Sequence, residues 1–152
     1  TIFAGKEAPP MSARLTAVGL IACAALVLAP GTAAATPSSG VQTRTLAQRT
    51  VGGTEYVLQE ITIAPGGSTG WHYHDGRLYA VVESGTLTRT LADCTTTMAH
   101  SRGDVIVEPS GPDHVHIGRN LGTTPVVLKA LYVNPVGKPL SQDVPAPDCA
   151  DR

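Results

Sequence analysis

The chain has 152 residues, 42% of them hydrophobic, with 11 basic and 12 acidic residues and a formal net charge of −1. This length allows one domain of ordinary size and little else. The basic residues form no stripe along the sequence, so a nucleic-acid partner is not expected.

The first thirty-five residues have the pattern of a secretory signal. A single charge, Arg14, follows Met11 and precedes an apolar run from Leu15 to Ala29. The small residues Ala33 to Ala35 then fit an A-x-A cleavage site, which predicts cleavage after Ala35 and secretion. The apolar run is shorter than the roughly 20 residues that a membrane-spanning helix needs. No stable membrane anchor is therefore expected.

One alternative for this segment stays open. The sequence Leu20-Ile21-Ala22-Cys23 resembles the lipid-attachment box of bacterial lipoproteins, which would make the protein membrane-anchored. The apolar run continues beyond Cys23, where a processed lipoprotein turns polar, and secretion is favoured for that reason. Residues 1–10 precede Met11 and show no pattern that assigns them a role.

From Thr36 onward, short runs of β-branched residues alternate with turns of Gly, Pro, Asn and Ser. This pattern predicts an all-β sandwich or barrel of about eight strands. The expected strands are residues 44–50, 56–63, 71–74, 77–82, 86–91, 105–108, 115–118 and 125–133. The expected segments are 1–35 (extension and signal), 36–54 (leader and first strand), 55–134 (barrel) and 135–152 (a proline-rich strap).

Two histidine pairs are the main candidates for a functional site. His72 and His74 lie in one predicted strand, and His114 and His116 flank Val115, the first residue of a later one. Residues i and i+2 of a strand point to the same face, so each pair should project two imidazoles in one direction. Imidazole is a good ligand for first-row transition ions, and strands that face each other could bring the two pairs together.

Other residues of these strands predict the surroundings of the histidines. Leu78, Ala80 and Val82 should share the interior and make a largely apolar cavity, which suits a small organic ligand. Trp71 and Tyr73 should face away from the histidines and pack in the core or at an interface.

Two cysteines, Cys94 and Cys149, follow the predicted signal. In an exported chain, an even pair of cysteines is typical of a disulfide, which here would close a loop of about 55 residues. Two free buried thiols are the alternative. Metal ligation by the cysteines is less favoured, because neither has another ligand close to it in sequence.

The spacing around the first histidine pair resembles that of the cupin superfamily, whose fold is a double-stranded β-helix or jelly-roll barrel. The first cupin motif is G-x5-H-x-H-x3,4-E-x6-G, which is matched by Gly66, His72, His74 and Gly85, with Leu78 in place of the glutamate. The second motif is G-x5-P-x-G-x2-H-x3-N, which is matched by Gly103, Pro109, Gly111 and His114, with Gly118 in place of the asparagine. Three residues separate His116 from Asn120, so His114 matches the front of this motif and His116 its back.

The resemblance implies a metal site. In cupins the ligands are the two histidines of the first motif, its glutamate and the histidine of the second motif. Carried onto this chain, the ligands are His72, His74 and His114, without a carboxylate, and His116 becomes a fourth ligand or a catalytic acid or base. The expected cofactor is one divalent transition metal ion (Fe, Mn, Cu, Ni or Zn), whose charge would favour an anionic ligand.

No carboxylate is expected to replace the missing glutamate. Counted by alternation, Glu83 lies on the opposite face of its strand, and Asp75 lies in a turn. Glu108, which directly precedes Pro109, is expected to face outward.

Two functions follow as hypotheses. The first is a secreted mononuclear metal cupin that acts on a small molecule, as a dioxygenase or another oxidoreductase, with His116 moving a proton. The second is a non-catalytic module that binds a metal or a small ligand, which the missing glutamate favours. A structural protein of the cell envelope is a third reading. The resemblance also allows a homodimer.

Overall fold

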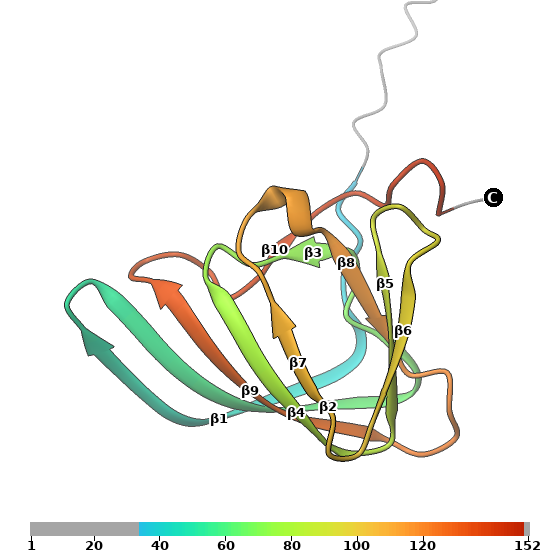
Figure 1. Cartoon of the computed structure of the whole chain (residues 1–152), viewed down its shortest axis with the longest axis horizontal. Coiled ribbons are helices and arrows are strands. Elements are labelled where there is room, and N and C mark those ends of the chain that lie inside the picture. The colour runs from blue at the N-terminus through green and yellow to red at the C-terminus, as the bar shows by residue number, and fades with distance from the viewer. Residues whose placement is uncertain (1–33, 151–152) are drawn as a thin grey trace, which may run out of the picture. The chain divides into compact units, whose positions relative to one another are not determined.

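The computed structural model describes residues 34–150, which fold into an all-β, nearly closed barrel (Figure 1). The predicted fold class is therefore confirmed. The expected signal segment lies almost entirely in residues 1–33, outside the described residues. Among the residues that are described, no helix has the length and apolar character needed to span a bilayer.

The strands are antiparallel and short apart from the first two. In chain order the elements are β1 (Ser39–Val51), β2 (Thr54–Ser68), β3 (His72–Tyr73), β4 (Arg77–Ser84), β5 (Thr86–Leu91), β6 (Thr97–Ser101), β7 (Val105–Glu108), the 3-10 helix η1 (Pro112–His114), β8 (His116–Arg119), β9 (Val126–Pro135) and β10 (Gln142–Asp143). The predicted bounds of β5 and β7 match those of the structure, whereas β6 and β10 were not predicted.

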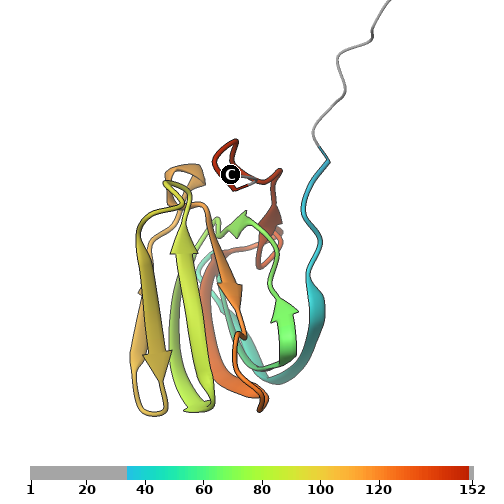
Figure 2. The same cartoon turned by 90° about the vertical axis from the view of Figure 1, so that its right-hand side faces the viewer.

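Strand pairing builds two walls that face each other. One wall has the order β1-β2-β9-β4-β7, and the other has the order β10-β3-β8-β5-β6 (Figures 1 and 2). The walls meet where Ser68 of β2 pairs with Arg119 of β8. This arrangement brings β3 together with β7 and β8, which follow it by about thirty residues or more, around one interior space.

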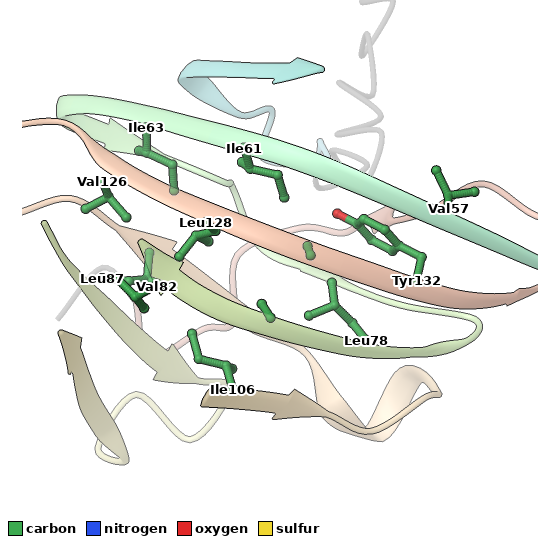
Figure 3. Close-up of a cluster of buried hydrophobic side chains, with 12 residues drawn as sticks. Val57, Ile61, Ile63, Leu78, Val82, Leu87, Ile106, Val126, Leu128 and Tyr132 are labelled. Carbon is green, nitrogen blue, oxygen red and sulfur yellow. The ribbon is translucent and has the colours of Figure 1, made fainter. Parts of the chain in front are cut away.

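The core lies between the walls and follows the two-residue period of the strands. In β4 and β9, buried residues alternate with more exposed ones along almost the whole strand. Figure 3 shows the buried side chains pointing toward one another, among them Leu78, Val82, Leu128 and Tyr132. Leu78, Ala80 and Val82 face the interior, as predicted.

Asn120 joins the two walls near their contact. Its side chain is 1% exposed, and its amide donates to the carbonyls of Ile63 (2.9 Å) and Thr124 (2.8 Å). Its carbonyl oxygen accepts from the amide of Gly122 (3.0 Å). The buried amide thus satisfies the buried carbonyl of Ile63 and two backbone groups of the loop between β8 and β9.

The predicted disulfide is present in the structure. Cys94 lies in the turn between β5 and β6, and Cys149 lies near the end of the described residues, with 6.1 Å between their Cα atoms. The bond closes a loop with a sequence separation of 55. Such a loop contributes roughly 4 kcal/mol through the reduced entropy of the unfolded chain.

We expect Asn120→Ala to lower the free energy of unfolding by roughly 3 kcal/mol, because it removes three hydrogen bonds and takes this donor from the buried carbonyl of Ile63. The measurement is urea unfolding followed by the fluorescence of Trp71, the sole tryptophan in the sequence, which is 2% exposed. The control is Gln48→Ala, which removes an amide that bonds to Glu55 at the surface. Equal losses in the two variants would contradict the role given to Asn120.

Candidate metal centre

Four buried side chains meet inside the barrel: His72, His74, Glu108 and His116. One ligand atom from each lies within 4.8 Å of all the others. His72 of β3 lies opposite His116 of β8 in the sheet, with ring centroids 4.4 Å apart. The ring of His74, just after β3, lies 4.9 Å from that of His72. Imidazole and carboxylate donors at this separation fit a single first-row transition ion.

The three imidazoles are oriented in the same way, each by one backbone carbonyl. The Nδ1 atom of His72 lies 2.9 Å from the oxygen of Gly70, that of His116 lies 2.9 Å from the oxygen of His114, and that of His74 lies 2.7 Å from the oxygen of Leu140. A carbonyl oxygen can only accept, so each Nδ1 carries the hydrogen. In a neutral ring this leaves the lone pair on Nε2, which is the tautomer that a metal ligand needs.

The carbonyl for His72 depends on a tight turn at Gly70. This residue has a φ of +71°, and a Cβ atom added there would lie 2.2 Å from the carbonyl oxygen of Thr36. Only glycine combines such a backbone with such a close neighbour. The turn thereby fixes the carbonyl two residues before His72.

Glu108 supplies a carboxylate at the centre of the cluster. Its Oε2 atom lies 2.9 Å from Nε2 of His74 and 3.1 Å from Nε2 of His116. A nitrogen that donates to this oxygen must carry a proton, and a metal ion that binds the same nitrogens would displace it. The other oxygen, Oε1, lies 2.9 Å from Nε of the buried Arg89. This contact is an ion pair, but the N–H group does not point at the oxygen well enough to form a hydrogen bond.

The expectation that Glu108 faces outward, and that the site has no carboxylate, is wrong. Glu108 is 6% exposed and lies directly opposite Leu78 in the pairing of β4 with β7. Directly opposite residues share one face of a sheet. The carboxylate of Glu108 therefore points into the same interior space that a glutamate in place of Leu78 would face. Alternation along this strand could have predicted the orientation of Glu108. The apolar Ile106 lies two residues before it, and residues i and i+2 of a strand share one face.

The predicted grouping of His114 with His72 and His74 is also wrong. His114 ends the 3-10 helix and is exposed, whereas His116 begins β8 and is 2% exposed. The two-residue rule does not apply across this boundary, because η1 is not a strand. His116 and Asn120 therefore take the histidine and asparagine places of the second motif, and the loop before them is two residues longer.

The cluster borders a small cavity of about 70 Å³ with mostly apolar walls. A wider space of about 190 Å³ shares His72, His74 and Tyr132 with it. That space continues past side chains of the N-terminal and C-terminal segments, namely Ser38, Val41, Thr43, Ser141 and Asp143. A small molecule can therefore reach the histidines between these two segments. Neither Trp71 nor Tyr73 lines the cavity, in agreement with their predicted orientation.

Burial and charge set the protonation of the cluster. Burial, together with the neighbouring rings of His116 and His74, lowers the pKa of His72 from 6.5 to about 4. Burial by itself raises the pKa of Glu108, but hydrogen bonds from His116 and His74 outweigh it and hold this pKa well below its usual value. At neutral pH, His72 is therefore neutral and Glu108 is ionised, which are the forms that bind metals.

We expect the protein stripped of metal by a chelator to lose stability as the pH falls from about 6.5 to about 4. In that window the unfolded chain protonates His72 and the folded chain does not, so the free energy of unfolding falls with falling pH, by roughly 3 kcal/mol in all. Glu108 adds to the loss at lower pH, as its carboxylate protonates. Urea unfolding across this range measures the slope, and the control is His72→Gln, which does not titrate. An unchanged slope in this variant would show that His72 is not the cause.

Solved structures share this fold. The polyketide cyclase RemF from Streptomyces resistomycificus is 24% identical, with a TM-score of 0.59 over 72% of this chain and 75% of that one. A cupin domain from Bordetella pertussis is 23% identical, with a TM-score of 0.53 over 65% of this chain and 96% of that one. An oxalate oxidase in complex with glycolate is 19% identical, with a TM-score of 0.51 over 62% of this chain and 51% of that one. At these identities the similarity shows the fold alone.

Sequence comparison assigns the family. No curated protein sequence matches the chain. The family model described as "Cupin domain" matches residues 59–133, a range that contains all four residues of the cluster. Together with the barrel topology and the cupin structures that share it, this match shows that the chain belongs to the cupin superfamily.

Proposed function

We propose that the protein binds one divalent transition metal ion through His72, His74, Glu108 and His116, and that this centre oxidises a small organic molecule. The observation that carries the proposal is the set of three backbone carbonyls that accept from the Nδ1 atoms of the histidines. Three buried imidazoles without a metal have no need of one common tautomer, whereas a metal site requires it.

The chain's own residues would set the properties of such a centre. A bound iron, manganese or copper ion would supply Lewis-acid and redox chemistry to ligands in its remaining coordination positions. Arg89 cancels the charge of Glu108, so a divalent ion would leave the site with two positive charges. Apolar walls formed by Leu78, Ala80 and Ile106 keep water from screening this charge. A small anionic substrate is favoured for that reason.

In this proposal His116 is a ligand. Its Nδ1 is held by the carbonyl of His114, and its Nε2 lies at the centre of the cluster. Neither nitrogen is left to move a proton, so the catalytic acid or base role expected for His116 is replaced by ligation. The metal set becomes three histidines and one glutamate, with His114 outside it.

We also propose that the protein is exported. A disulfide such as Cys94–Cys149 persists in oxidising compartments, which supports the signal predicted in residues 1–35. The test is the mass of the protein recovered outside the cell, which should correspond to a chain that begins at Thr36. A lipid-modified chain that begins at Cys23 is the alternative, and a homodimer stays a prediction.

A second function, metal or small-ligand binding without turnover, has one observation in its favour. The cavity beside the cluster is about 70 Å³, far below the roughly 300–1,000 Å³ of typical small-molecule sites. Oxygen consumption by the metal-loaded protein with small organic acids as substrates separates the two functions. Turnover would establish the enzyme, and its absence from a fully loaded protein would establish the binding module.

We expect the purified protein to contain close to one equivalent of a first-row metal, as measured by plasma mass spectrometry. His116→Ala should lower the metal affinity at least tenfold, because it removes a ligand. The matched control is His114→Ala, which removes an exposed imidazole two residues away and should leave the affinity unchanged. If His114→Ala lost metal and His116→Ala kept it, the assignment from the structure would be incorrect.

A second prediction uses the pairing of Leu78 with Glu108. Glu108→Leu should weaken metal binding tenfold or more, because it removes the carboxylate ligand. Adding Leu78→Glu should restore part of the affinity, since the two positions face the same interior space across neighbouring strands. Titration with metal against a competing chelator measures both changes. A double variant no better than Glu108→Leu would contradict the geometric equivalence of the two positions.

A further inference from the structure

The three carbonyls that orient the histidines differ in origin. His72 and His116 are each held by a carbonyl two residues earlier in the chain, so these contacts form within the local turn. His74 is held by the carbonyl of Leu140, which is 66 residues away in sequence. Leu140 belongs to the C-terminal strap, of which the structure describes residues 136–150 after the end of β9. The orientation of His74 therefore depends on where the strap lies.

Besides the disulfide, hydrogen bonds hold the strap at its start and in its middle, among them one from the amide of Gln142 to the carboxylate of Asp75 (2.7 Å) and two from Thr36 to the carbonyl of Val144. At its start, the buried amide of Asn134 donates to the carbonyl of Lys138 at 2.7 Å. In its middle, the two-residue strand β10 places Asp143 opposite His72, and the amide of Val144 donates to the carbonyl of Trp71 at 2.9 Å. The strap also contains the prolines Pro139, Pro145 and Pro147, which have no amide hydrogen to add to the sheet.

The disulfide closes the far end of this segment. Cys149 is bonded to Cys94 in the turn between β5 and β6, so the strap is anchored to both walls of the barrel. Both cysteines are half-buried, within reach of a small reductant. Without this bond, the pairing of β10 with β3, the hydrogen bonds of Asn134 and Gln142, and the packing of Leu140 against the core remain to keep the carbonyl of Leu140 at His74.

We infer that the C-terminal strap completes the metal site, and that the redox state of the Cys94–Cys149 disulfide controls the metal affinity through the Leu140 carbonyl and His74. The inference rests on the proposed metal function. When the disulfide is reduced, the strap loosens, His74 loses its fixed tautomer and orientation, and the ion is held less tightly. The chain gains its full metal affinity only in a compartment where the disulfide can form.

The reduction step is ordinary thiol chemistry. With a water-soluble phosphine, the S–S bond breaks, and each sulfur atom gains one electron and one proton to become a thiol. The phosphine is oxidised to its oxide with an oxygen atom from water, whose two hydrogens supply the protons. A phosphine suits the experiment, because a thiol reductant would itself bind the metal.

The first experiment measures zinc affinity by competition with a chromophoric chelator, for the oxidised protein, the phosphine-reduced protein and Cys94→Ser/Cys149→Ser. We expect zinc binding to weaken about tenfold or more in the last two, as for the loss of a group that orients a ligand. Leu140→Ala keeps the disulfide and should also weaken zinc binding. This variant replaces the cysteine variant in the test if the cysteine variant does not fold. Circular dichroism confirms that each sample is folded at the temperature used.

A second readout does not require metal. In the oxidised protein without metal, the Nδ1 hydrogen of His74 should give a slowly exchanging NMR signal, because the ring is buried and this hydrogen is bonded to the carbonyl of Leu140. Reduction should abolish this signal and leave that of His72, whose carbonyl is local. The matched control for general loss of stability is Val126→Ala, a core truncation at the end of β9 opposite to the end that leads into the strap. This variant should preserve both signals and the zinc affinity.

The outcomes are distinct. Equal zinc affinity and an unchanged His74 signal after reduction would overturn the inference, and so would an equal loss of zinc affinity in Val126→Ala. If the oxidised protein bound no metal at all, the proposed function would fail. The NMR signal of His74 would still decide whether the disulfide holds the strap on this histidine.

Discussion

The site depends on hydrogen bonds from three imidazole rings to backbone carbonyls. Each bond fixes both the direction of a ring and the nitrogen that carries its hydrogen. Because a carbonyl cannot donate, no rearrangement of protons can reverse this choice. The barrel thus directs three Nε2 atoms toward one point, and their order is established when the chain folds rather than when a ligand binds. Without a metal, the Nε2 atoms of His74 and His116 donate to Glu108.

The second constraint is electrostatic. Glu108 and Arg89 are both buried, and each would be costly to bury alone. The carboxylate is kept ionised by two histidines on one oxygen and by Arg89 beside the other. The same contacts place a positive charge next to the ligand set. A metal ion would therefore act in a cavity whose net charge attracts anions and whose walls exclude water.

The architecture explains why the carboxylate can come from an unexpected strand. In an antiparallel sheet, residues directly opposite each other share a face and lie close together. Leu78 and Glu108 are such a pair. The carboxylate that the first cupin motif places on β4 therefore comes from β7 in this chain, and it still points into the interior. The strap adds a contact of another kind, since it closes over the barrel from the end of the chain and depends on a disulfide for its position.

Local sequence patterns were sufficient for the fold class, for most strands and for the first histidine pair. Two-residue alternation marked the interior face of β4, and short β-branched runs between turns indicated the barrel, because these features depend only on neighbouring residues. The second half of the site was decided by tertiary structure. His114 ends a 3-10 helix whereas His116 begins β8, and the place of Glu108 depends on which strand pairs with β4. Pairing between distant strands is set by long-range packing, which no local period records.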